Sequence, residues 1–124
     1  MANSVISLSA LPGAPACSID SRTVTYYFQA RFGAGSYVLG GLPINFASAV
    51  IANGAPIEVR AFSNASPPSV YTYQFNSNQA DASAPSIATG GLQIFGSGGT
   101  EQVAGATPAG VVADTITVIA KFAR

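Results

Sequence analysis

The side chains of this sequence that could take part in chemistry are few and far apart. The chain has 124 residues, with five acidic and five basic side chains, one cysteine and no histidine. Nucleophilic catalysis by serine or cysteine usually needs a neighbouring base, most often histidine, so such a site is not expected. Metal sites need clustered His, Cys, Asp or Glu. The acidic residues are instead widely separated: Asp20, Glu58, Asp81, Glu101 and Asp114. The sequence therefore predicts a protein that is not an enzyme and has no metal site and no cofactor.

Three weaker patterns resemble ligand sites, and each has a simpler interpretation. The segment 76–81, NSNQAD, is the nearest approach to a calcium loop, but a plain solvated turn is the favoured interpretation. The glycines of 33–35 and 96–99 neither open a helix nor precede Lys-Ser or Lys-Thr, so a phosphate loop is not predicted. Five tyrosines could stack on sugars, although aromatic residues on alternating strands more often belong to a core or an interface. They are Tyr26, Tyr27, Tyr37, Tyr71 and Tyr73.

Charge is unusually scarce in this chain. Only 8% of the residues are charged and the net charge is zero, against about 25% charged residues in an average soluble protein. A surface with so little charge favours self-association or burial against partner chains. The basic residues are scattered, which argues against binding to nucleic acid. No stretch of about 20 mainly apolar residues indicates a membrane span. With a single cysteine and no signal peptide, assembly in the cytoplasm is expected.

Alternation of apolar and polar residues is the main structural signal. In 22–32, one face has Val24, Tyr26 and Phe28 while the other has Thr25 and Tyr27, as in a half-buried strand. The C-terminal segment 115–122 repeats the pattern. Shorter strands are predicted at 36–39, 57–63, 70–75 and 92–95. Glycine, proline and asparagine separate these runs at short intervals, which is typical of a β-sandwich or barrel. One all-β domain is therefore predicted over residues 21–124.

The uncharged stretch GSYVLGGLPINFASAVI, at 35–51, is interpreted as a corner of the fold. Gly40 and Gly41 interrupt it, and one of them is expected to have a positive φ angle. Pro43 then fixes the exit of the chain and cannot donate to a sheet. Ile44 and Phe46 are expected to return to the core.

The first twenty residues differ from the rest. Residues 1–19 contain no charge, and Pro12, Gly13 and Pro15 oppose regular structure. Val5, Ile6 and Leu8 could form a short edge strand. The segment 1–20 is predicted to be an extended arm, either a loose terminus or an arm that docks on a neighbouring subunit. Its candidate contact residues for a capsid or a subunit are Val5, Ile6, Leu8, Pro12 and Pro15.

The order of features over about 22–124 resembles the small decoration or cement proteins of tailed bacteriophage capsids. The resemblance is carried by the aromatic strand, then YVLGGLPINF (37–46), PIEV (56–59), YTY (71–73), LQIF (92–95) and DTITV (114–118). It implies a jelly-roll-like β-sandwich. It also implies a non-enzymatic protein that binds the outer surface of the capsid and stabilises it, in the virion, with the major capsid protein as partner.

Two further expectations concern partners and the competing interpretation. A small subunit gains affinity for a repeating lattice by oligomerising, and a trimer would match local threefold positions. The alternative is a receptor- or glycan-binding β module of a phage fibre or a surface adhesin, which the tyrosines and the polar loops favour.

Overall fold

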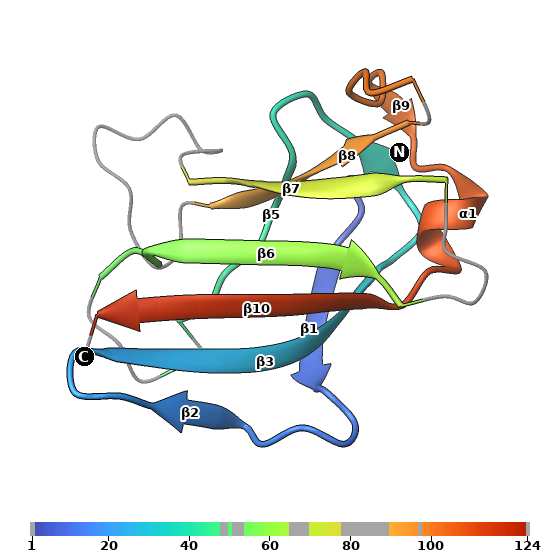
Figure 1. The fold of residues 1–124 in the computed structure, drawn as a ribbon. Helices are drawn as coiled ribbons and strands as arrows, with labels where there is room; N and C mark the ends of the chain where they lie inside the picture. The colour runs from blue at the N-terminus through green and yellow to red at the C-terminus, as the bar shows by residue number, and fades with distance from the viewer. Residues whose placement is uncertain are drawn as a thin grey trace.

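The fold is almost entirely β (Figure 1), and the computed structural model describes residues 2–47, 50, 54–64, 70–77, 90–96 and 98–123. The large sheet has the order β1-β3-β10-β6, with β2 also paired to β3. Its strands are β1 (Ile6–Ala10), β2 (Cys17–Ile19), β3 (Thr23–Phe32), β6 (Glu58–Ser63) and β10 (Ile116–Ala123). All its pairings are antiparallel.

A smaller sheet and two minor elements complete the described structure. The smaller sheet has the order β5-β8-β7, from β5 (Leu42–Pro43), β7 (Thr72–Asn76) and β8 (Gly91–Phe95). A two-stranded pair joins β4 (Ser36–Tyr37) to β9 (Gly105–Ala106), and one short helix, α1 (Ala109–Val112), precedes β10. Each predicted strand corresponds to an observed one, although the expected strand at 36–39 ends at Tyr37.

One core lies between the two sheets. The alternation in β3 and β10 places Val24, Phe28, Ile116, Val118 and Phe122 in the core, as the sequence predicted. Side chains from the smaller sheet close it from the other side, and aromatic pairs cross between them. Phe46 lies 5.6 Å from Phe122 and 5.9 Å from Phe28, and Phe32 lies 6.0 Å from Tyr73, between ring centroids. The all-β, sandwich-like fold is confirmed, whereas the jelly-roll connectivity is not.

The extended N-terminal arm is not confirmed either. Its residues Ile6–Ala10 and Cys17–Ile19 form β1 and β2, and both pair with β3 of the same chain. Earlier still, Ser4 is 3% exposed and its hydroxyl lies 2.7 Å from that of Thr107. Pro12 and Pro15 do prevent regular structure, but only in the short excursion 11–16 between the two strands. β1 and β2 thus form the edge of the large sheet, and Ile6 and Leu8 of β1 pack against the core.

Candidate functional site

The predicted corner at Gly40 and Gly41 has the backbone conformation that only glycine adopts easily. Their φ angles are 90° and 108°. The amide of Gly41 donates to the carbonyl of Val38 at 3.2 Å, which closes the turn. Pro43 follows in β5, an edge strand, opposite Gly91 and with its side chain exposed. Ile44 and Phe46 are fully buried in the core. The stretch therefore serves the scaffold of the protein.

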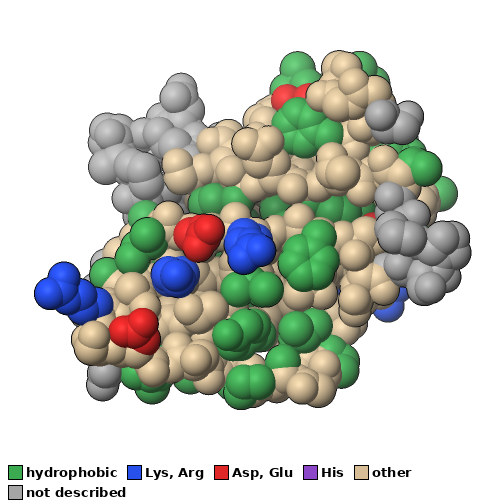
Figure 2. Space-filling view, viewed as in Figure 1, with side chains coloured by type: hydrophobic (Ala, Val, Ile, Leu, Met, Phe, Trp, Pro, Cys, Tyr) green, Lys and Arg blue, Asp and Glu red, His purple; other side chains and the backbone are tan. Residues whose placement is uncertain are grey.

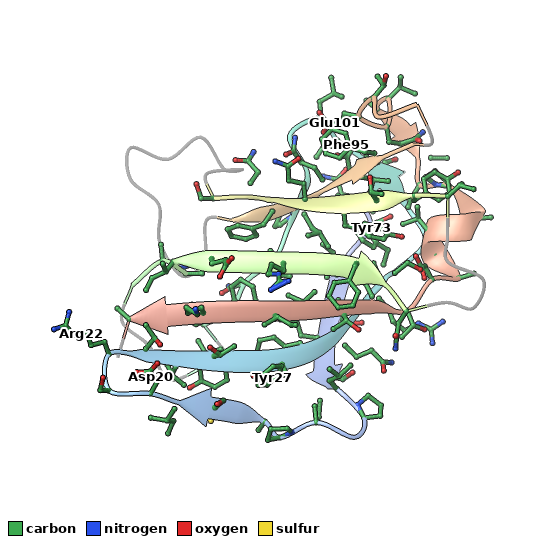
Figure 3. The ribbon with its side chains drawn as sticks, viewed as in Figure 1. Asp20, Arg22, Tyr27, Tyr73, Phe95 and Glu101 are labelled. Carbon is green, nitrogen blue, oxygen red and sulfur yellow. The ribbon has the colours of Figure 1, made fainter. Side chains whose placement is uncertain are left out.

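A carboxylate that the sequence did not single out holds this corner in place. Oε2 of Glu101 accepts hydrogen bonds from the hydroxyl of Tyr37 at 2.6 Å and from the amide of Gly40 at 2.8 Å. The Tyr37 hydroxyl also accepts a hydrogen bond from the amide of Ile94, in β8, at 3.1 Å. The side-chain amide of Asn76 donates to the carbonyl of Gly40 at 3.0 Å. The backbone of Glu101 forms an isolated β-bridge with Phe95, at the end of β8 (Figure 3), so one cluster joins four segments of the chain.

The environment of this cluster changes the pKa of both ionisable partners. Burial, reinforced by the hydrogen bond to Glu101, raises the pKa of Tyr37 well above its ordinary value of 10.0. Burial by itself would raise the pKa of Glu101. The hydrogen bonds from Tyr37, the Gly40 amide and Gln93 outweigh that effect, so the pKa of Glu101 lies below its ordinary value of 4.5. The folded protein therefore favours a neutral phenol beside a charged carboxylate.

We expect Tyr37→Phe to lower the free energy of unfolding by about 1–3 kcal/mol, because it leaves the buried Ile94 amide without its acceptor. Urea denaturation at pH 7 measures the loss. Tyr27→Phe is the matched control, since the Tyr27 ring lies on the outer side of β3 and this change should cost little. Equal stability of the wild type and Tyr37→Phe would contradict the structural role of the hydroxyl.

Tyr37 and Glu101 contribute to the stability of the fold only within a range of pH. A lowered pKa at Glu101 stabilises the fold above pH 4.5, and the contribution is lost as the pH falls through the folded-state value. A raised pKa at Tyr37 stabilises the fold below pH 10.0, and the contribution is lost as the pH rises above it. The difference in the free energy of unfolding between the wild type and Tyr37→Phe should therefore be largest between these two pH limits.

The remaining carboxylates are used for structure more than for pairing with basic groups. Asp114 is 4% exposed and accepts hydrogen bonds from Ser63 and Tyr73, each at 2.7 Å. Glu58 lies 3.9 Å from Lys121, in a pair that is largely exposed and so contributes little stability. Glu101 and Asp114 are thus held by hydrogen bonds within the fold. Asp81 and the segment 78–81 of the calcium-like pattern lie outside the described residues.

The outer face of the large sheet is a surface built by three neighbouring strands. Neighbouring positions on β3, β10 and β6 form three rows across it: Gln29–Thr117–Phe62, Tyr27–Ile119–Arg60 and Thr25–Lys121–Glu58. Phe62 is 46% exposed. We call these nine residues the outer face. Figure 2 looks onto it and shows its charged side chains gathered toward one end, with hydrophobic side chains beyond them.

A hollow of about 260 Å³ lies where the N-terminal edge is interrupted. β1 pairs with β3 from Phe32 to Phe28, and pairing resumes where the carbonyl of Ala16 accepts the amide of Tyr27, so residues 11–15 leave the sheet. The hollow is mostly apolar, and Tyr26 and Tyr27 are among the residues that line it. The other walls come from Leu8, Ser9, Ala10, Ala16 and Phe28.

The structure separates the predicted contact residues into two groups. Ile6 and Leu8 are half-buried and pack against the core, so their side chains are mainly structural. Val5, Pro12 and Pro15 are exposed, Val5 to 73%. Among the tyrosines, Tyr37 and Tyr73 are buried and cannot stack on a ligand. Cys17 is half-buried against the core, as expected of a small apolar side chain.

Comparisons with known proteins add nothing to this geometry. No family model, curated protein or solved structure matches the chain. Within the described residues, no group of three or more His, Cys, Asp or Glu side chains could hold a metal ion. None of the helices in that part of the chain has the length and apolar character needed to span a membrane. The candidate functional features are therefore the outer face, the hollow and the N-terminal edge.

Proposed function

We propose that the protein is a non-enzymatic structural protein that binds the outer surface of a phage capsid and stabilises the shell. The outer face carries this proposal. Its uncharged part combines exposed Phe62 with half-buried Ile119, Tyr27 and Gln29. Neutral groups lose less on dehydration than charges do, so this part of the face can be buried against a partner at a lower cost than the end with Glu58, Arg60 and Lys121.

The proposed partner is the major capsid protein, and the proposed location is the virion, after assembly in the host cytoplasm. The low charge of the whole chain and the resemblance of its order of motifs to capsid decoration proteins support this assignment. Repetition of the binding site over the lattice would multiply the affinity of an oligomer.

We expect Phe62→Ala to weaken binding to capsids by about tenfold or more, because a large aromatic side chain that becomes buried in an interface often contributes much of its binding energy. Cosedimentation of the purified protein with capsids measures the affinity. Val103→Ala is the matched control, since Val103 is 70% exposed but lies outside the outer face. Both variants should keep the melting temperature of the wild type.

Two results would contradict the proposal. One is the absence of the protein from assembled particles in a mass-spectrometric census of the virion. The other is equal capsid binding by the wild type and Phe62→Ala, which would leave the outer face without a role.

A second candidate function is glycan or receptor binding, as in a fibre or adhesin module. The hollow beside Tyr26 and Tyr27 favours it, because tyrosine rings can pack against sugar faces. A glycan array tests this function, with Tyr27→Ala as the variant that should lose any signal. An array without binding would leave the capsid role as the better supported function.

A further inference from the structure

We propose that the free edge of β1 pairs with the same edge of a second copy of this chain, in an antiparallel arrangement around a two-fold axis. Its first support is the hydrogen-bonding pattern of β1. The amide of Gly33 donates to the carbonyl of Val5, so the odd-numbered residues of this segment face β3. The amides and carbonyls of Ile6, Leu8 and Ala10 consequently point away from the sheet. No backbone hydrogen bond joins them to any described residue outside that pairing.

The position of β1 in the fold leaves this edge open. The opposite edge of the large sheet, β6, lies against β7. Before β1, Ser36 donates to the carbonyl of Ala2 and accepts from the amide of Ser4. The outward side of residues 2–4 is therefore already paired. Within the described structure, the open stretch begins at Ile6, where the pairing with Ser36 has ended. It offers a short ladder of unpaired backbone groups.

The composition of the edge favours self-pairing. Proteins commonly protect such an edge with lysine, other charges or proline within the strand. β1 has the sequence ISLSA, and no charge occurs before Asp20. The two copies of β1 therefore present no like charges to each other within the strand itself.

Two antiparallel copies of β1 also have matching side chains and backbone groups. With Leu8 on the two-fold axis, Leu8 faces Leu8, Ile6 faces Ala10 and Ser7 faces Ser9 of the other copy. All the outward amides, at the even-numbered positions, then meet outward carbonyls. The leucines add apolar contact on the core side, and the serines meet on the outer side. This pairing supplies the surface for the oligomer proposed above, and it makes that oligomer a dimer.

Cysteine cross-linking tests the register directly. Ser7→Cys and Ser9→Cys are prepared separately in a Cys17→Ala background, since both serines are exposed and neither contributes to the core. Positions 7 and 9 of opposing copies would lie close enough for a disulfide. We expect a mixture of the two variants to form a disulfide-linked heterodimer under mild oxidation, with much less cross-linking in either variant alone. No cross-linking in the mixture, or equal cross-linking in all three samples, would overturn the proposal.

A backbone variant tests the free edge independently. Ala10→Pro removes one outward amide per copy from an exposed position, while Ala10→Ser keeps that amide as the matched control. Sedimentation of the isolated protein should show a dimer that Ala10→Pro weakens at least tenfold and Ala10→Ser does not. A protein that stays monomeric up to about 1 mM, or a trimer unaffected by Ala10→Pro, would overturn it. Because no capsid is present, these results do not depend on the capsid-binding proposal.

Discussion

Gly41→Val is expected to lower the free energy of unfolding by about 4 kcal/mol or more, which is exceptional for a single substitution. Two effects add at this position. The φ angle of 108° is strained for any residue with a side chain. A Cβ atom would also lie 2.9 Å from both the carbonyl carbon and the oxygen of Leu92, whose backbone is fixed in β8. Urea denaturation followed by tyrosine fluorescence measures the change.

Gly40→Ala separates the two effects, because Gly40 has a similar φ angle but more space around it. A Cβ atom at this position would have the side chain of Asn76 as its nearest neighbour, 3.9 Å away. The cost of Gly40→Ala should be about 1–2 kcal/mol from backbone strain alone. Should Gly41→Val prove as stable as Gly40→Ala, the close approach of the corner to β8 would be refuted.

Deletion of residues 1–19 is expected to abolish cooperative unfolding. The deletion removes β1 and β2, the buried contact between Ser4 and Thr107, and the cover that Ile6 and Leu8 give to the core. It also exposes the whole edge of β3, which would promote aggregation. Circular dichroism during thermal unfolding and size-exclusion chromatography measure the outcome.

Pro12→Ala with Pro15→Ala is the control for this deletion. Both prolines are exposed in the excursion between β1 and β2, so the double variant should change stability by less than about 1 kcal/mol per site. A deletion variant that melts at the temperature of the wild type would show that the N-terminal segment is an arm after all.

Much of the fold followed from the sequence because strands with one buried face have a two-residue period. The alternation in β3 and β10 predicted their inward residues, including Phe28 and Phe122. The glycine pair predicted the corner, because few other residues tolerate a positive φ angle. These signals are local, so one sequence suffices to find them.

The features that the sequence could not provide depend on contacts between distant segments. Ile6 and Leu8 carry the alternation of a strand, but nothing local says whether their partner belongs to the same chain. Glu101 lies in a loop of glycine and small residues, with no basic neighbour, so its contacts with Tyr37 and Gly40 come only from folding. The outer face likewise depends on the order of β3, β10 and β6.

The place of β10 in the large sheet has a consequence for the kinetics of folding. This strand lies between β3 and β6, although it comes from the opposite end of the chain to β3. A long loop must therefore close before the centre of the sheet can form, and folding dominated by such distant pairings is slow. Until β10 inserts, β3 and β6 each have an unpaired edge. Slow insertion of β10 would therefore prolong the exposure of these edges, through which a newly made chain can aggregate.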